Sequence, residues 1–526
     1  MVTLYAGGQY HLYTFKKYQD IRIVFAPEKQ IAFFGGDPDN FEYPRYDLDV
    51  AFFRVYENDQ PVKPPHYLNW SPAGCKEGEL TFVSGHPGRT SRQNTVAELK
   101  YLRDVGYPYV LQRLNRLEVL LQAWGGRSES NMQRAEETLF SIQNSRKARI
   151  GGLAGLLDPS VLARKEADEK RLRDFIVSHT DTELRGVDKT FDVIARANKV
   201  RAEMAVPYAL IEQGGAFNSD LFGIARTLAR AADELPKPNG ERLPEFGEAR
   251  LNSLKFRLFS DEPIYDDFEI IKLADSLTFF ATSMGPDSEI AKQVLAGKSP
   301  RERAFELVSG TKVRDVEVRK KLFEGGKAAV DAAKDPMIEL ARLIDPASRD
   351  IRKKYEAEVD EPRRQSYAAL AKARYLMDGT KVYPDATFTL RLAFGQVKGY
   401  TEDGKPMPAF TTMAGLYARS KDQGNKGPFE LPKRWEERKS KLDPNTPFNF
   451  VSTADIIGGN SGSPVINQKG EVVGLIFDGN IQSLVLDIIY DEKEARAVSV
   501  DSRAIVEALR KVYDASDLAD ELTRKQ

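Results

Sequence analysis

The sequence has one cysteine, four histidines and no long apolar run among its 526 residues. A single thiol, Cys75, cannot form a disulfide within the chain, and the scattered histidines offer no His/Cys cluster that could hold a metal ion. A membrane-spanning helix needs about 18 or more consecutive apolar residues, and the chain contains no such run. We therefore expect no metal, no cofactor, no internal disulfide and no membrane span.

The chain also lacks an excess of charge of either sign. Its 77 Lys and Arg residues nearly balance 78 Asp and Glu residues, so the formal net charge is −1. Nucleic-acid-binding domains normally carry a basic excess, so we expect no nucleic-acid partner. Residues 1–8 have neither the basic region nor the apolar core of a secretory signal, so the sequence predicts no signal peptide in this chain.

Three segments with different secondary-structure patterns follow one another in the sequence. Residues 1–105 hold short apolar and alternating segments typical of strands, whereas residues 106–380 are charged, Ala-rich and helical in pattern. Strand signals return in residues 381–526, which end in a stretch typical of a closing helix. This order predicts a β region interrupted by a helical insertion rather than three independent domains.

A glycine-rich turn is the strongest chemical signal. Residues 457–466 read Ile-Gly-Gly-Asn-Ser-Gly-Ser-Pro-Val-Ile. Such a turn can expose the hydroxyl of Ser461 as a nucleophile, while the backbone N–H groups of Gly459 and Ser461 form an oxyanion hole. A plain β-turn is the alternative, but Pro464 and the apolar run at residues 471–477 favour the nucleophile.

An aspartate that could complete the acidic arm of a catalytic triad opens another apolar stretch. Asp49 precedes Val-Ala-Phe-Phe, and a carboxylate there can orient a histidine and stabilise its protonated form. An aspartate that merely caps a strand gives the same pattern. Asp47 is a second candidate, because residues two apart lie on one face of a strand.

Longer motifs resemble one family. Residues 33–45 read Phe-Phe-Gly-Gly-Asp-Pro-Asp-Asn-Phe-Glu-Tyr-Pro-Arg. Together with residues 84–90, the serine turn, and residues 477–480 and 499–503, they are similar in order and spacing to the bacterial dipeptidyl peptidases 7 and 11. The resemblance covers essentially the whole chain. It implies serine-type removal of dipeptides from peptide substrates with a free N-terminus, by homodimers in the periplasm or at the cell surface.

The resemblance also implies an architecture of β plus α class, a trypsin-like double β-barrel with a large inserted helical domain. Residues 1–105 would be the remainder of an N-terminally incomplete first barrel, and residues 106–380 the helical cap. Residues 381–526 would form the C-terminal barrel, with the nucleophile and the closing helix.

The resemblance assigns roles residue by residue. Ser461 matches the nucleophile and Asp49 the triad aspartate. Asp478 and Asn40 match groups that bind the substrate α-ammonium, and Phe41 supplies an aromatic wall. Gly479 lies in the S1 pocket where acid-specific members carry arginine, which predicts a preference for apolar penultimate residues.

The family's catalytic histidine is missing. It lies in a Thr-Asn-His-His-Cys-Gly segment upstream of the residue that matches Asp49, and this chain has no such segment. The four histidines present are His11, His66, His86 and His179, and none fits a triad pattern. We therefore expect that the start of the first barrel is absent and that the chain is inactive as it stands. The alternative is a non-catalytic peptide-binding or scaffold protein.

Overall fold

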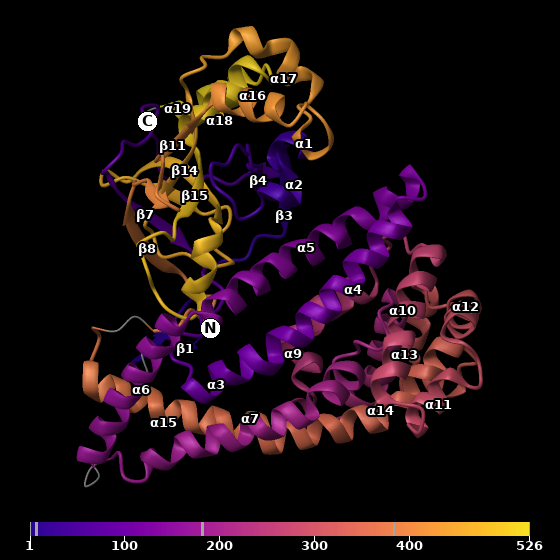
Figure 1. The fold of residues 1–526 in the computed structure, drawn as a ribbon. Coiled ribbons are helices and arrows are strands. Elements are labelled where there is room, and N and C mark those ends of the chain that lie inside the picture. Colours follow the sequence, from indigo (N-terminus) through magenta and orange to yellow (C-terminus); the bar gives the residue numbers. More distant parts are fainter. Residues whose placement is uncertain (1, 6–8, 180–182, 382–383, 525–526) are drawn as a thin grey trace. The chain divides into compact units, whose positions relative to one another are not determined.

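The computed structural model describes residues 2–5, 9–179, 183–381 and 384–524, and it mixes helices with sheets. The chain divides into two compact units (Figure 1). The first unit comprises Met1–Asn115, Phe140–Asp188 and Ala368–Gln526, and the second comprises Arg116–Leu139 and Lys189–Tyr367. No helix among the described residues is long and apolar enough to cross a membrane.

An eight-stranded sheet organises the first unit. The strand order is β11-β12-β15-β14-β13-β7-β8, all antiparallel, with β6 parallel beside β14. Strands that are far apart in sequence are neighbours in this sheet. For example, Phe82 on β7 lies opposite Phe394 on β8. The strands are β6 (Asn69–Trp70), β7 (Leu80–Gly85), β8 (Arg391–Gln396), β11 (Phe410–Thr412), β12 (Pro447–Ser452), β13 (Pro464–Ile466), β14 (Glu471–Gly479) and β15 (Ala497–Asp501).

Three smaller sheets complete the β structure of this unit. They are β3 (Asp20–Phe25) with β4 (Phe52–Glu57) and β5 (Gln60–Pro61), β1 (Val2–Tyr5) with β2 (Gln9–Leu12), and β9 (Tyr400–Glu402) with β10 (Lys405–Met407). The strand order among the described residues is that of open sheets, although one bridge joins Val397, just after β8, to Ser452 on β12. The two-barrel arrangement therefore stays a prediction.

Some of the described helices lie entirely within the first unit. They are α1 (Lys29–Ala32), α2 (Gly36–Asp39), α3 (Val96–Tyr101), α6 (Pro159–Ser178), α16 (Met413–Asp422), α17 (Lys433–Arg438), α18 (Ser502–Lys511) and α19 (Ser516–Thr523). The predicted closing helix is thus two helices, separated where Asp514 adopts a left-handed φ of 51°.

The second unit is helical in its described part. Its helices are α7 (Thr190–Pro207), α8 (Asp220–Glu234), α9 (Glu248–Leu258), α10 (Asp266–Met284), α11 (Glu289–Leu295), α12 (Pro300–Gly310), α13 (Val316–Ala332) and α14 (Pro336–Tyr355). Local sequence sets their starts: Ser299 and Glu302 form a capping box on α12, and Asp335 accepts the first N–H groups of α14.

The boundary between the units differs from the predicted segment 106–380. It falls inside α4 (Tyr107–Gly125), α5 (Glu129–Leu157) and α15 (Glu361–Asp378), so residues 140–188 belong with the sheets. Contacts explain this: Arg146 on α5 pairs with Asp37 at 2.9 Å, and Lys147 donates to the carbonyl of Asn40 at 3.0 Å. Helical periodicity in the sequence cannot show which unit a helix packs against.

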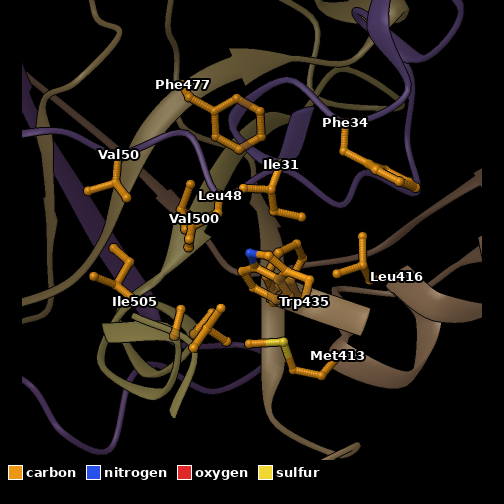
Figure 2. Packing of buried hydrophobic residues seen from close by; sticks show 14 of the residues in the cluster. Ile31, Phe34, Leu48, Val50, Met413, Leu416, Trp435, Phe477, Val500 and Ile505 are labelled. Carbon is orange, nitrogen blue, oxygen red and sulfur yellow. The ribbon is translucent and has the colours of Figure 1, made fainter. Parts of the chain in front are cut away.

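Trp435 lies at the centre of the main apolar core of the first unit (Figure 2). Leu48, Leu416 and Val500 are among the fully buried side chains around it, contributed by segments hundreds of residues apart. The indole Nε1 donates to the hydroxyl of Tyr513 at 2.9 Å, which satisfies its one polar atom. This core holds the segment of residues 31–50, which carries the candidate site, against β12, β15 and α18.

Candidate functional site

A pocket of about 320 Å³ in the first unit gathers the residues singled out from the sequence. The separate segments that meet there are the loop at residues 40–49, helix α5, the serine turn and the end of β14. Predicted site residues in its lining are Asn40, Phe41, Asp49, Ser461, Asp478 and Gly479. Gly459 lies within the same turn, between the lining residues Gly458 and Asn460.

The serine turn needs glycine at position 459. Its φ is 108°, and a Cβ there would lie 2.5 Å from the carbonyl oxygen of His86. Ser461 is exposed, and its hydroxyl donates to the carbonyl of Phe477 at 3.3 Å. Within the described part of the chain, the N–H groups of Gly459 and Ser461 donate no hydrogen bond, which leaves both for a ligand oxygen.

The structure separates the two candidate aspartates. Asp47 is fully buried, pairs with Arg45 at 2.8 Å and does not line the pocket. Asp49 lines the pocket and is exposed to solvent. The protein around it raises the pKa of Asp49 to about 6, against the lowering effect of Arg45. Of Asp47 and Asp49, only Asp49 can therefore face a ligand in this pocket.

Arg45 is a buried cation beneath the pocket. It is 1% exposed, and Nη1 donates to Oδ2 of Asp478 at 2.8 Å while Nε donates to Oδ2 of Asp47 at 3.0 Å. Phe41 adopts a left-handed φ of 59°, which directs its N–H to the same Asp478 oxygen at 3.3 Å. Desolvation raises the pKa of Asp47 to about 8. Arg45 ends the motif at residues 33–45, and no pattern in that motif marks it as a buried cation.

Asn40 is held by a helix that is distant in sequence. It is 4% exposed, and its Nδ2 donates to Oδ1 of Asn144 on α5 at 2.9 Å. Asn144 also lines the pocket, beside Phe140 of the same helix. Sequence analysis did not identify Asn144. An asparagine within a helical sequence pattern carries no signal that its side chain contacts a residue 104 positions earlier in the chain.

Gly479 meets the side chain of Ser483. A Cβ at position 479 would lie 2.2 Å from the hydroxyl of Ser483 and 3.4 Å from the carbonyl oxygen of Arg496. Both Gly479 and Ser483 line the pocket. A side chain at position 479 therefore requires Ser483 to move.

None of the four histidines, all of which lie in the described part of the chain, lines this pocket. His11 lies on β2 opposite Thr3, and His179 follows α6. His66 is exposed, and the ring of His86 lies 6.1 Å from that of Phe388. The pocket thus contains a serine and an aspartate without a histidine between them.

Comparison with known proteins places these features in a family. Among curated relatives, the Asp/Glu-specific dipeptidyl-peptidase of Shewanella putrefaciens is 29% identical over 98% of this chain and 76% of its own length. Dipeptidyl-peptidase 7 of Capnocytophaga gingivalis is 27% identical over 99% of this chain and 75% of its own length.

Solved structures match the fold. Porphyromonas endodontalis DPP11 in complex with the dipeptide Arg-Asp superposes with a TM-score of 0.80 at 21% identity, covering 100% of this chain and 77% of the other. The same protein in an alternate conformation gives a TM-score of 0.68. A sequence profile of the Peptidase S46 family matches residues 1–524. The chain therefore belongs to the Peptidase S46 family, whose dipeptidyl-peptidases are peptide hydrolases.

Proposed function

We propose that the pocket of the first unit binds the free N-terminus of a peptide and presents the second peptide bond to Ser461, for release of a dipeptide. One observation carries this proposal: a single pocket holds Ser461, Asp49, Asp478 and Asn40. Among the lining residues, Arg45 is the one cationic residue, and it is set against the carboxyl groups of Asp49 and Asp478. The excess of negative charge favours an α-ammonium, which Asp478 and Asn40 would bind by hydrogen bonds.

The roles at the reacting bond follow from chemistry. Ser461 would attack the carbonyl carbon, and the free N–H groups of Gly459 and Ser461 would stabilise the oxyanion. Asp49 must be ionised to orient and stabilise a protonated base. Without a histidine in the pocket, the Ser461 hydroxyl lacks that base, so we expect the chain alone to bind peptides with little or no turnover.

A non-catalytic peptide-binding or scaffold protein is the second candidate. The observation that favours it is the hydrogen bond from the Ser461 hydroxyl to the carbonyl of Phe477, a backbone group that cannot take the proton. A fluorophosphonate probe separates the two readings once an upstream segment carrying the family's histidine is fused to the chain. Covalent labelling of Ser461 in that fusion, absent in Ser461→Ala, supports the peptidase; a fusion that binds peptides but never labels supports the binding protein.

For the penultimate substrate residue we propose a preference for apolar side chains. The relatives carry both Asp/Glu-specific and dipeptidyl-peptidase 7 names, so a name alone does not decide. Gly479 contributes no charge, and Arg45, the cationic residue among the lining residues, is already paired with two carboxylates. An Asp or Glu side chain would find no free partner there.

Three broader features are also proposals. The bridge between Val397 and Ser452 supports closure of β12, β15, β14, β13, β7 and β8 into one barrel of a trypsin-like pair. Exposed Ile23 and Phe53, on β3 and β4, support burial in a homodimer, which light scattering would test. A periplasmic or cell-surface location rests on the resemblance alone and is tested by fractionating the native host.

Calorimetry with dipeptides tests the proposed pocket directly. We expect a dipeptide ending in Leu to bind, its N-acetylated form to bind at least about tenfold more weakly, and one ending in Asp to bind more weakly than Leu. Asp478→Asn should remove the distinction between free and acetylated forms, while Asp443→Asn, far from the pocket lining, should keep it. Equal binding of free and acetylated dipeptides to the unmodified chain would refute the ammonium site.

A further inference from the structure

A second cavity, of about 410 Å³, lies in the first unit and shares the lining residues Ile456 and Ile457 with the serine pocket. One wall is the first four residues of β8, and the facing wall is the loop at residues 455–457. Pro87, Thr90, Arg92 and Tyr490 complete much of the lining. None of the residues given a role in dipeptide release lines this groove, so it calls for an explanation of its own.

The backbone of β8 faces this groove with unpaired groups. β8 ends the strand order and pairs with β7 on one side. Gln396 reveals the direction of its other edge, because its carbonyl accepts the N–H of Thr453 at 3.0 Å and its N–H donates to the Thr453 hydroxyl at 3.0 Å. Since alternate residues of an antiparallel strand point the same way, the N–H and C=O groups of Phe394 and Leu392 also point away from β7.

Within the described part of the chain, the backbone groups of Leu392 and Phe394 have no hydrogen-bond partner on that edge. A row of unpaired donors and acceptors along a strand is a template for another strand. The four residues 391–394 span about 13 Å at about 3.3 Å each, which is enough to pair a segment of about four residues.

The side chains around this edge define what that segment carries. Leu392 and Phe394 are 60% and 51% exposed, and Ile456 and Ile457 form the facing apolar wall. Arg92 makes two hydrogen bonds to Asp455, at 2.6 and 2.7 Å, and the other two charged lining residues, Arg391 and Glu492, are opposite in sign, so the lining carries no net charge. The groove therefore suits uncharged, apolar side chains on an extended backbone.

We propose that this groove binds an extended, uncharged apolar segment of a partner protein, which adds to the outer edge of β8 as a further strand. Backbone hydrogen bonds to Leu392 and Phe394 supply the pairing, and the apolar walls select the side chains. The segment needs no free amine, which distinguishes this site from the dipeptide pocket.

The probe is a fluorescein-labelled hexapeptide of alternating Val and Thr, acetylated at its N-terminus and amidated at its C-terminus. Titration of the full chain, followed by fluorescence anisotropy, should give saturable binding. N-methylation of one set of alternate amides should weaken binding at least about tenfold, while the other set matters less, because only one set faces β8. No binding, or equal loss from both sets, would overturn the proposal. Blocked ends keep this result independent of the ammonium site.

A matched pair of variants locates the site. Leu392→Asp places a charge on the groove wall, whereas Leu390→Asp changes a similarly exposed residue, at 49%, that does not line it. We expect at least about tenfold weaker binding for the first and an unchanged affinity for the second. Ala386→Trp, which fills the cavity, should also block binding. Equal affinity of all three variants for the peptide would overturn the proposal. It would also be overturned if the chain binds no peptide but self-associates, and if Leu392→Asp abolishes that self-association, because the occupant would then be a second copy of the chain.

Discussion

Arg45 and Asp478 form a buried ion pair in which Nη1 lies 2.8 Å from Oδ2, with side-chain exposures of 2% and 11%. The same guanidinium holds Asp47, so one cation serves two carboxylates beneath the candidate site. This arrangement fixes the direction of Asp478, the group that we propose binds the substrate ammonium. Without the guanidinium, the side chain of Asp478 would no longer be held in this direction, and the negative charge of Asp478 would no longer be neutralised.

Replacement of that cation should be costly. Arg45→Met leaves two buried carboxyl groups without their cationic partner, and we expect a loss of about 3–5 kcal/mol in the free energy of unfolding. Urea denaturation followed by Trp fluorescence measures it. As a control, Arg54→Met breaks a surface pair with Glu521, at side-chain exposures of 36% and 54%, and should cost less than about 1 kcal/mol. Similar losses for both variants would contradict the buried pair.

The carboxyl group of Asp49 should release its proton at a higher pH than an ordinary aspartate, because its pKa is raised. Its pKa is raised to about 6 in the folded chain, so it binds a proton between pH 4 and 6 that the unfolded chain has released. Its contribution to folding stability therefore declines as pH rises from the unfolded pKa towards the folded one. Carboxyl ¹³C NMR, with Asp49→Asn to assign the signal, should show a midpoint near 6. A midpoint near 4 would show that Asp49 lies in an aqueous setting.

The only thiol should be protected until the first unit opens. Cys75 is 1% exposed and packs in a second apolar cluster, and burial raises the pKa of its thiol. We expect iodoacetamide to alkylate the native chain very slowly and the urea-unfolded chain quickly, as read by intact-mass spectrometry. Cys75→Ser, which cannot be alkylated, shows the background. Rapid labelling of the native protein would contradict this core.

Trp435 should be the most sensitive position of the main core. It is fully buried, so Trp435→Ala is expected to cost about 3–5 kcal/mol in the free energy of unfolding. Trp435→Phe keeps an aromatic ring and loses the bond to Tyr513, whose hydroxyl still donates to Glu28 at 2.6 Å, so the cost should be smaller. Phe256→Ala, at an 83% exposed position, should change little. Thermal unfolding followed by circular dichroism would rank the three.

Position 479 should accept a side chain only if the side chain of Ser483 moves away from it. Gly479→Ala places a Cβ 2.2 Å from the Ser483 hydroxyl, and we expect lower stability and weaker dipeptide binding. Removing the hydroxyl in Gly479→Ala with Ser483→Ala should recover much of the loss, because the 2.2 Å contact disappears and the Ser483 Cβ, at 3.1 Å, is only a tight contact. Denaturation and calorimetry on the double variant test this, and no recovery by Ser483→Ala would contradict the packing.

Local sequence was sufficient for several elements. The strand patterns predicted within residues 1–105 and 381–526 include β7, β12 and β15, and the helical pattern predicted for residues 106–380 includes α4. Periodicity succeeds there because burial of one face repeats every two or about 3.6 residues. Periodicity does not show that residues 140–188 group with the sheets, because their partner surface is distant in sequence.

The sequence by itself determined the family signature, the serine turn and the candidate aspartates, because these depend on residue types at fixed short spacings. Only the tertiary structure decided that Asp49 rather than Asp47 faces the pocket, that Asn144 reaches Asn40, and that Arg45 neutralises Asp478. These choices depend on where the main core and α5 place segments that lie 104 to 433 residues apart. Burial and ion pairing between such segments are properties of the packed chain, and no local pattern encodes them.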